Sequence, residues 1–522
     1  MKLSLPVMAL LALTFGGVGV GGLYYATNMQ NQSTAQVTSD SGSIVADFTV
    51  GGDPWIGYAA LGSPALQSSL RSEGIVFRYD SPNVVSYATR MEQVTSGELD
   101  FAVATVDANL LNTQNFLQGG VIVAVLDQST GGDALVCNHM RINGIDDFSN
   151  QPDWKIAFTP DSPSHHLLRA IGNDFGVDAL LAQGDWRVEV DGSGAALEAL
   201  QAGSVDCAVL WQPDVTTATR GSNELGVVYS SGEADGLIVD VLMVHRGHLQ
   251  PSSPMRPYVQ TVLQNYFATV RGFSDDPAFA LEQVNAYLRE YDGDRYPEAD
   301  VQAMMAGVSW VNLTENAESW FGVGGANRYY KLEEAHDFAC VLIEADEAHG
   351  SDFCRRIRPQ GFINGQMIAA LYESQTITEH NATITDPLEL RFTPLSALQW
   401  NTLTPQGTLR SRRIVFQPGS NELAPETIGA LREAMNDFKR YPRSRLEVRV
   451  GFNPTLGDTI EADAAARAAA VMTYLVDTYS IDENRVRVST QAAPQQDGEG
   501  GRAYQSRLRE VGLGLLRENN EI

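Results

Sequence analysis

Residues 155–168 read KIAFTPDSPSHHLL, and this stretch decides the fold class. An apolar run ends at Phe158, small polar residues follow, and Pro163 stands at the start of the next amphipathic segment. Ser162 or Ser164 is suited to cap a helix here, because a serine hydroxyl accepts a hydrogen bond from a free N–H group of the first turn. The stretch therefore predicts a strand, a turn and a helix. Its helix start is a candidate site for an anion or a polar headgroup, with plain capping as the competing interpretation.

The same pattern repeats between residues 43 and about 271, where short β-rich runs alternate with amphipathic segments. Such alternation predicts parallel sheets with crossover helices, in which ligands bind at the carboxyl ends of the strands. The turn 191–195 (DGSGA) repeats the strand–turn–helix logic, and its glycines would let the backbone approach a ligand closely. The expected strands are 45–50, 74–79, 101–104, 120–126, 154–158, 186–190 and 207–210, and helices are expected at 164–175 and 195–202.

The rest of the chain divides into a helical stretch, a connector and a last unit. Apolar spacing of three and four between residues 254 and 373 predicts helices, and a polar, Pro-containing connector follows at 387–407. The last unit shows a βαβαββ order, which predicts a small two-layer α/β domain. The helices expected in the first part are 257–270, 277–290 and 299–307; the last unit has strands at 414–416, 446–450, 486–488 and 508–516 and helices at 425–441 and 460–479.

The N-terminus carries an apolar run from Leu3 to about Ala26 without a charged residue. A bilayer-spanning helix needs about 20 apolar residues, whereas the apolar region of a cleaved signal has about 7–15. The run therefore favours a single-pass inner-membrane anchor, with a cleaved signal as the alternative. Lys2 is the nearest positive charge and places the terminus in the cytoplasm and the bulk of the chain in the periplasm. The polar stretch that follows, to Ser43, is expected to be a flexible tether.

Composition narrows the function classes. The formal net charge is −28, and such an excess of carboxylates repels nucleic-acid backbones. The cysteines suit an oxidising compartment: Cys340 and Cys354 could close a short loop, whereas Cys137 and Cys207 would meet through tertiary structure or remain buried thiols. The chain has no C-x-x-C pair, G-x-S-x-G, P-loop or H-E-x-x-H motif. We therefore expect no metal, no cofactor and no enzyme activity.

Residues 96–102 (SGELDFA), 201–214 (QAGSVDCAVLWQPD) and the turn 162–166 resemble the periplasmic solute-binding proteins of the nitrate/sulfonate/taurine ABC-transporter type. Residues 311–322 resemble the closing helical region of that family, and the likeness covers about 45–325. The resemblance implies a two-lobed fold that closes on a small anionic or zwitterionic solute for uptake or sensing. It also implies an ABC permease or another envelope protein as partner.

By position, the resemblance draws the ligand pocket from residues that follow the expected strands. Trp55 and Trp211 each allow two interpretations. They could pack in the core, or they could lie on either side of a planar part of the ligand. The two adjacent histidines of the turn point about 100° apart on a helix and cannot easily ligate one ion. The implied pocket residues are Asp53, Trp55, Thr105, Ser162, Ser164, His165, Ser193, Trp211 and Asp240.

The last ~110 residues resemble the OmpA-like peptidoglycan-associated domain, a resemblance carried by segments 414–423, 448–451 and 467–471. In that family an Asp and an Arg grip diaminopimelate of the wall peptide, and Arg467 matches the Arg. The Asp is missing, because 451–454 reads GFNP, and Asp458 or Asp463 would have to substitute. The resemblance implies either peptidoglycan binding or a former wall binder that now serves as a docking or spacer module.

The expected organisation is an anchor or signal at 1–27, a linker at 28–43, a solute-binding-like domain with a helical extension at 44–385, a linker at 386–410 and an OmpA-like domain at 411–522. The fold class is therefore α/β, with two lobes, a helical extension, a small C-terminal α/β unit and an N-terminal transmembrane helix. The first function hypothesis is a membrane-tethered solute-binding protein. The alternative is an envelope scaffold or peptidoglycan-associated adaptor with a vestigial solute-binding fold.

Overall fold

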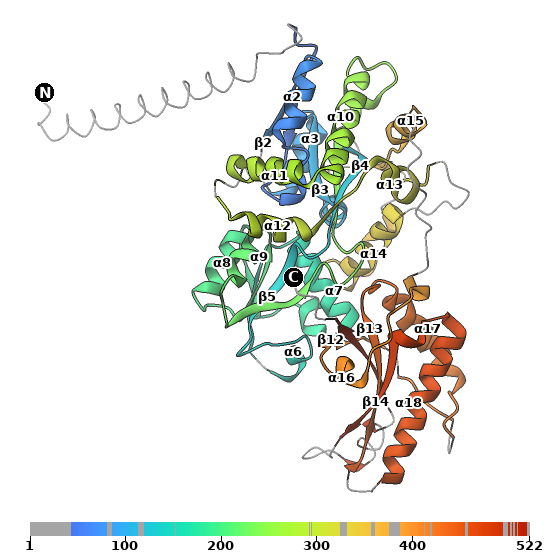
Figure 1. The fold of residues 1–522 in the computed structure, drawn as a ribbon. Helices are drawn as coiled ribbons and strands as arrows, with labels where there is room; N and C mark the ends of the chain where they lie inside the picture. The colour runs from blue at the N-terminus through green and yellow to red at the C-terminus, as the bar shows by residue number, and fades with distance from the viewer. Residues whose placement is uncertain are drawn as a thin grey trace, which may run out of the picture.

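The computed structural model arranges the chain as two α/β lobes, a helical segment and a C-terminal α/β unit (Figure 1). The predicted anchor at 1–27 and nearly all of the linker at 28–43 lie outside the described residues, among which no helix is long and apolar enough to cross a membrane. The structure describes residues 43–80, 86–112, 120–151, 153–291, 293, 295–323, 331–356, 361–374, 387–411, 413–417, 420–454, 458–493, 500, 501, 504, 507, 508 and 510–518.

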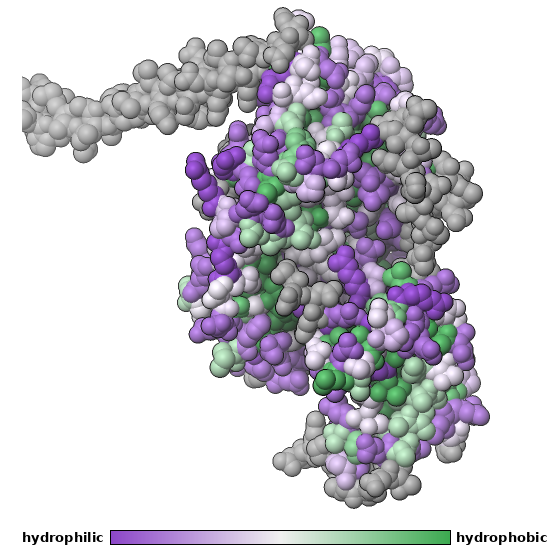
Figure 2. All heavy atoms as spheres, in the orientation of Figure 1, coloured by the Kyte–Doolittle hydropathy of each residue, from purple (hydrophilic) through white to green (hydrophobic). Residues whose placement is uncertain are grey.

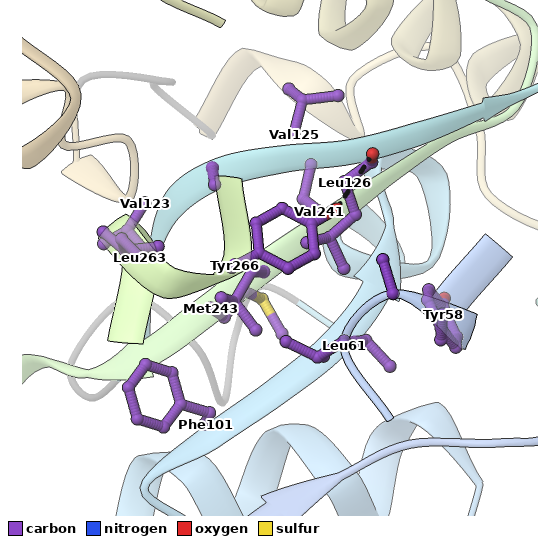
Figure 3. Packing of buried hydrophobic residues seen from close by; sticks show 14 of the residues in the cluster. Tyr58, Leu61, Phe101, Val123, Val125, Leu126, Val241, Met243, Leu263 and Tyr266 are labelled. Atoms are coloured by element: carbon purple, nitrogen blue, oxygen red, sulfur yellow. Dashed lines mark hydrogen bonds between the residues drawn. The ribbon is translucent and has the colours of Figure 1, made fainter. Parts of the chain in front are cut away.

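Lobe 1 is built on a six-stranded sheet in the order β11-β4-β10-β3-β1-β2. Its central strands are apolar on both faces, as a sheet covered by helices on both sides requires. Figure 3 shows Met243 and Phe101 below the ring of Tyr266 and Val241 beside it, and the hydroxyl of Tyr266 donates to the carbonyl of Leu126 at 3.2 Å. The strands are β1 (Ala46–Gly51), β2 (Ile75–Asp80), β3 (Phe101–Thr105), β4 (Gly120–Ser129), β10 (Val239–His245) and β11 (Val308–Trp310); the helices include α2 (Pro64–Ser72), α3 (Tyr87–Ser96), α4 (Val106–Leu111), α10 (Arg256–Asp275), α11 (Pro277–Tyr291) and α12 (Glu298–Ala306).

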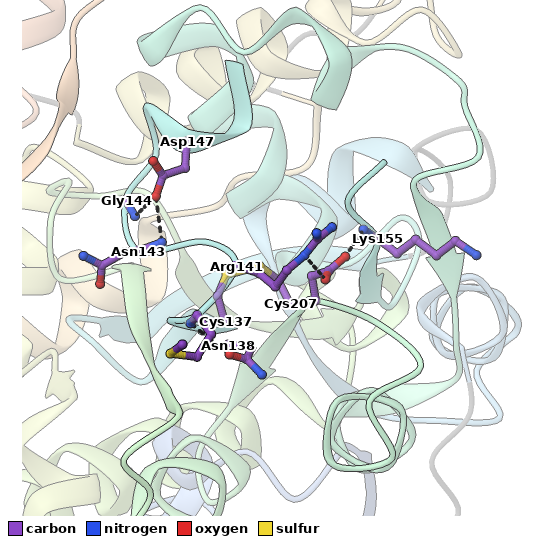
Figure 4. Close-up of a disulfide and its surroundings, with 10 residues drawn as sticks. Cys137, Asn138, Arg141, Asn143, Gly144, Asp147, Lys155 and Cys207 are labelled. Carbon is purple, nitrogen blue, oxygen red and sulfur yellow. Dashed lines mark hydrogen bonds and ion pairs between the residues drawn. A yellow bond between two sulfur atoms is a disulfide. The ribbon is translucent and has the colours of Figure 1, made fainter. Parts of the chain in front are cut away.

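Lobe 2 is built on a five-stranded sheet in the order β7-β6-β8-β5-β9. Cys137 and Cys207 stand opposite each other on the paired strands β5 and β8 and form a disulfide (Figure 4). Near this bond, Arg141 pairs with Asp206 at 3.0 Å. The elements are β5 (Asp133–Asn138), α6 (Asp147–Asn150), β6 (Ile156–Phe158), α7 (Pro163–Phe175), β7 (Arg187–Glu189), α8 (Gly192–Gln201), β8 (Cys207–Trp211), α9 (Asp214–Thr219) and β9 (Leu225–Ser230).

The predicted strands and helices of the lobes are confirmed with shifts of a few residues at their ends, but both sheets are mixed rather than parallel. Four strands were not expected: β5, β9, β10 and β11. Strand β10 pairs antiparallel with both β3 and β4, far away in the sequence. A local pattern shows that a run is apolar but not which distant partner it meets, so the antiparallel strands escape sequence reasoning.

Two neighbouring chain segments join the lobes, between β4 and β5 and between β9 and β10. The hydroxyls of Ser129 and Ser231 lie 2.7 Å apart and hold these segments together. Gly307 also packs there, because its carbonyl accepts hydrogen bonds from Thr130 and Gly132 at 2.9 and 3.0 Å. A Cβ on Gly307 would stand 2.8 Å from the nitrogen of Gly132, so this approach requires glycine. Paired crossing segments of this kind are the arrangement in which two lobes can rotate about a hinge.

The helical segment after lobe 1 includes α14 (Lys331–Ala345) and α15 (Gln366–Ser374). Helix α14 packs on α4 of lobe 1 and on α7 of lobe 2, so it bridges the lobes beside the crossing segments. A disulfide between Cys340 and Cys354 ties its end to the following turn. Just beyond α14, Asp346 pairs with the fully buried Arg169 of α7 at 2.8 Å.

The C-terminal unit has a four-stranded sheet in the order β12-β15-β13-β14, with two helices. The strand expected at 414–416 is wrong, because Phe416 forms only one isolated bridge, to Leu423. Instead β12 supplies the first strand from inside the stretch expected to be a linker at 386–410. Its sequence, TPQGT, hides a strand because proline is tolerated at a sheet edge, where β12 lies. The elements are β12 (Thr404–Thr408), α17 (Pro425–Phe438), β13 (Arg445–Phe452), α18 (Asp458–Tyr479), β14 (Val486–Ala492) and β15 (Val511–Arg517).

The C-terminal unit is packed firmly against lobe 2, and the two share one hydrophobic core. Asp174 of α7 is fully buried and accepts hydrogen bonds from Arg440 and from the hydroxyl of Tyr441, both at 2.7 Å. Glu233 of the second crossing segment pairs with Arg517 of β15. On the face drawn in Figure 2, hydrophobic residues gather on this unit, whereas hydrophilic residues spread over the lobes. The unit and lobe 2 therefore form one body.

Candidate functional site

A cavity of about 390 Å³ lies between the lobes, at the carboxyl ends of β1, β3, β6 and β8. This volume is in the range of small-molecule sites. Lobe 1 and lobe 2 each supply one wall, and Ile238 of the second crossing segment also lines the cavity. The lining residues are Asp53, Pro54, Trp55, Tyr58, Ser86, Tyr87, Arg90, Thr105, Asp133, Thr159, Ser162, Pro163, Asp191, Gly192, Ser193, Gly194, Trp211, Pro213, Asp214, Ile238 and Asp240.

The lobe 1 wall is organised by Arg90 of α3, which is 1% exposed. Its two terminal nitrogens donate to Asp53 at 3.1 and 3.2 Å and to the carbonyls of Val103 and Gly52 at 2.8 and 3.2 Å. Burial opposes the charge of Arg90, but Asp53 together with three neighbouring tyrosines, Tyr87, Tyr58 and Tyr79, outweighs burial, and the pKa of the guanidinium is raised. Arg90 therefore fastens the turn after β1 to β3, and its charge is already matched.

Below this wall, Asp127 of β4 and Asp240 of β10 form a buried carboxyl pair. Asp127 accepts from the indole N–H of Trp55 at 3.2 Å, and Asp240 accepts from the hydroxyl of Tyr58. Burial raises the pKa of Asp127 to about 7, and burial together with Asp127 raises that of Asp240 well above its usual value. Two carboxyls so close cannot both ionise easily, so the pair holds a proton near neutral pH.

Two further polar groups line the cavity, one from each lobe. Asp133 is 4% exposed, and burial raises the pKa of its carboxyl to about 7. Thr105 ends β3 and is 2% exposed, and its hydroxyl has no hydrogen-bond partner among the described residues. A buried hydroxyl without a partner costs about 1–3 kcal/mol, so a polar group that binds it is a physical expectation of the cavity.

The lobe 2 wall consists of the helix starts after β6 and β7. Ser162 caps α7, because its hydroxyl oxygen accepts from the N–H of Ser164 at 3.2 Å. In α8, the N–H of Gly192 donates to the hydroxyl oxygen of Thr159 at 3.1 Å. Ser193 accepts from the N–H of Trp211 at 3.1 Å and thereby joins α8 to the end of β8. Part of the donor capacity of both helix starts is therefore used within the chain.

Seven of the nine residues expected in the pocket line this cavity. Ser164 and His165 do not, although both are buried. His165 packs on Phe158 with ring centroids 5.0 Å apart, and its Nε2 lies 3.3 Å from Asp346 beyond α14. Its neighbour His166 packs against Phe338 of α14, and burial lowers its pKa. Both histidines therefore pack inside the protein, and the described part of the chain holds no group of residues suited to a metal.

Sequence reasoning missed several lining residues, above all Tyr58, Tyr87, Arg90 and Asp133. Tyr87 and Arg90 lie on the first turns of α3, which no family motif marks. Asp133 ends the turn 131–133 (GGD), which comes soon after the apolar run 120–126. An acidic residue at that place was a usable signal in the sequence. Tyr87 and Arg90 reach the cavity from α3, and Asp133 reaches it from the start of β5, a strand that was not expected.

The second site expected from sequence surrounds Arg467 of α18, which is 8% exposed. Its Nη1 donates to the carbonyl of Leu508 at 3.2 Å, and its Nε lies 3.5 Å from Asp463 on the same helix. Asp463 thus stands near Arg467, as the expectation of a surrogate Asp required. The guanidinium, however, is already occupied by its own chain.

Solved structures of solute-binding proteins resemble this chain. The ligand-binding component of an ABC-type import system from Staphylococcus aureus, with zinc bound, matches at 14% identity and TM-score 0.44 over 63% of this chain and 98% of its own. A putative periplasmic sulfonate-binding protein from Methylobacillus flagellatus matches at 16% and 0.44, over 63% and 95%. The periplasmic aliphatic sulphonate-binding protein from Escherichia coli matches at 16% and 0.42, over 61% and 98%.

The zinc and the sulfonates in these descriptions are ligands of those three proteins. No family model and no curated protein sequence matches this chain. The two-lobed α/β architecture is shown by the topology of this chain itself. Two sheets are joined by paired crossing segments, and a cavity lies between the lobes.

Proposed function

We propose that the chain captures a small solute between its two lobes and performs no chemistry on it. The observation that carries the proposal is the cavity itself: it lies between the lobes and is lined by the buried hydroxyl of Thr105, which has no hydrogen-bond partner within the described ranges. Structural packing alone gives no reason to keep such a hydroxyl beside an open volume. A bound solute that accepts from or donates to Thr105 accounts for both features.

Capture is proposed to take place at the periplasmic face of the inner membrane, with residues 1–27 as the anchor. The solute then passes to an ABC permease or changes the contacts of an envelope partner. The C-terminal unit is proposed to act as a docking or spacer module, because Arg467 is engaged within its own domain. Protease accessibility of the C-terminal unit in spheroplasts tests this placement, and protection of that unit from added protease would contradict it.

The binding proposal is tested by thermal unfolding of the full-length protein against solutes of every charge class. A ligand present at 100 times its Kd stabilises the folded state by about 2.7 kcal/mol. Gly194 lines the cavity, and a Cβ there meets no atom within 4 Å, so Gly194→Phe should fill the cavity without disturbing the fold. Gly429 of α17 has equally open surroundings outside the cavity, so Gly429→Phe is the matched control.

The expected result is a rise in melting temperature with at least one solute in the wild type and in Gly429→Phe, and none in Gly194→Phe. A stabilisation that persists in Gly194→Phe would place the site elsewhere. The absence of stabilisation by every class of solute would contradict solute capture.

A further inference from the structure

The charges that line the cavity are strongly unbalanced. Among the described lining residues, Arg90 is the one cationic side chain, and it is held by Asp53 and by two carbonyl oxygens. No lining Lys or His joins it in that set. The carboxyls that face it are Asp53, Asp133, Asp191, Asp214 and Asp240. An anionic solute would meet a surplus of carboxyls, of which those of Asp133 and Asp240 are held protonated toward neutral pH by burial, and no unmatched cationic side chain among the described lining residues.

The helix starts that sequence reasoning offers to an anion do not reverse this balance. At α7, the Ser162 side chain occupies the N–H of Ser164. At α8, the hydroxyl of Thr159 occupies the N–H of Gly192, and the exposed Asp191 precedes the helix. The turn before α7 also carries Asp161, whose pKa is held well below its usual range by hydrogen bonds from His165 and His349. A carboxylate therefore stands beside each helix start.

Aromatic rings form much of the remaining wall. Trp55, Tyr58 and Tyr87 come from lobe 1, and Trp211 comes from lobe 2. The ring of Tyr87 already receives the guanidinium of Arg90, whose carbon lies 4.9 Å from the ring centroid. Rings attract cations through their faces, and carboxyl groups beside them add to this attraction. Aromatic rings together with buried carboxyls suit an organic cation and not a sulfonate.

We propose that the captured solute carries a positively charged nitrogen, held between Asp133 and Asp240 and flanked by the rings of Trp55 and Tyr58, with a polar atom bound to Thr105. This inference rests on the proposed function and names the class of its ligand. The class is an organic ammonium compound, and a zwitterion belongs to it only through its cationic end. The negative ion expected from the family resemblance is not the feature recognised.

The proposal has a consequence for pH. Asp133 is surrounded by Asp53, Asp107, Asp127 and Asp240, and Arg90 is the cation across the cavity. The carboxyls of Asp133 and of the Asp127–Asp240 pair retain protons near neutral pH in the empty cavity. A bound cation replaces such a proton, so the affinity for a cation should rise with pH, by up to about tenfold per unit for each proton displaced.

The experiment compares solutes that differ in charge but hardly in shape. Choline is set against 3,3-dimethylbutan-1-ol, benzylammonium against benzyl alcohol, and methanesulfonate serves as the anion, all on the full-length protein by thermal unfolding at pH 6 and pH 8. We expect stabilisation by the cationic member of at least one pair, more at pH 8 than at pH 6. Its neutral partner and methanesulfonate should give less.

Isosteric variants locate the charge. Asp133→Asn should weaken cation binding at least tenfold, whereas Asp337→Asn should leave it unchanged, because the Asp337 side chain is 81% exposed on α14. Stabilisation by methanesulfonate or by the neutral solutes, lost in Gly194→Phe, would keep solute capture and overturn the positive charge. Cation binding that Asp133→Asn does not change would overturn the assigned position. If no solute of any charge stabilises the protein, the proposed function fails and the inference fails with it.

Discussion

Two helices of this molecule each hold a buried arginine, and their surroundings differ. Arg90 of α3 is matched by Asp53 in lobe 1, and next to it lies a cavity with raised carboxyl pKa values and an unpartnered hydroxyl. Arg467 of α18 donates to the carbonyl of Leu508 and lies near Asp463 of its own helix. In neither place is the arginine itself available to a ligand. The surroundings of Arg90 differ from those of Arg467 because polar groups that line the cavity beside Arg90 lack partners among the described residues.

The largest expected effect comes from removing the charge of each arginine. Arg90→Met leaves the carboxylate of Asp53 buried without its partner, and breaking such a pair costs about 3–5 kcal/mol. Arg467→Met should cost about 1–2 kcal/mol, because its carboxylate partner Asp463 is 56% exposed and can be solvated. Urea unfolding of the two variants measures the difference. Equal losses would show that the two arginines are embedded alike.

A pH series should show directly how the buried carboxyl of Asp133 affects the free energy of unfolding. Burial raises the pKa of Asp133 to about 7, whereas the unfolded chain releases that proton near pH 3.9. Between these values the folded state binds more protons than the unfolded state, so the free energy of unfolding falls as pH rises, by at most about 1.4 kcal/mol per unit, and levels off above the folded pKa. Unfolding of the empty protein from pH 4 to 8 measures this slope.

Asp133→Asn is the variant for that series, since it removes the titrating group and keeps the shape of the side chain. We expect a shallower fall between pH 4 and pH 7 than in the wild type. Asp337→Asn, which changes an exposed carboxyl, should reproduce the wild-type slope. An unchanged slope in Asp133→Asn would mean that another group carries the pH dependence.

Replacing a threonine by valine should change the stability of the protein in opposite directions at Thr105 and at Thr427. Thr105→Val removes the unpartnered hydroxyl of the cleft and should stabilise the empty protein by about 1 kcal/mol while weakening ligand binding. Thr427 is fully buried in the C-terminal unit, and its hydroxyl donates to the carbonyl of Val415 at 2.7 Å and accepts from its N–H at 2.8 Å. Thr427→Val should therefore destabilise by about 1–2 kcal/mol. Loss of stability in both variants would show that Thr105 has a structural partner.

The smallest effect is expected for binding to the peptidoglycan of the cell wall. Because the guanidinium of Arg467 is engaged by its own chain, Arg467→Ala should not change the amount of protein that sediments with purified sacculi. Sedimentation of the wild type that Arg467→Ala abolishes would give the C-terminal unit the wall-binding role.

The sequence predicted the elements that local chemistry determines. The strand at 156–158 and the helix from Pro163 follow from an apolar run, a serine cap and a proline, all within one short stretch. Strand β10 and edge strand β12 were missed, since the first is defined by partners far away in the sequence and the second by its position at an edge. Antiparallel pairing and sheet order depend on such distant contacts.

The site divides in the same way. Asp53 follows a strand and Thr105 and Trp211 end strands, and these were found. Arg90 lies on α3 and Asp133 begins β5, a strand that was not expected, and these were not found. The positive charge proposed for the ligand was also not expected from the sequence. The free N–H groups of a helix start are visible in a sequence, but the hydroxyls of Ser162 and Thr159, each of which accepts from one of those N–H groups, become visible only in the fold.

The contacts of Asp174 with Arg440 and Tyr441 make the C-terminal unit an extension of one wall of the cleft. The N-terminal chain enters the other wall, at β1 of lobe 1. If residues 1–27 anchor the chain, as proposed, and an envelope partner holds the far end of the unit, lobe 1 is attached to the anchor and lobe 2 to the partner. Closure on a solute would then change the distance between the anchor and the partner, so that occupancy of the cavity changes the length of the molecule.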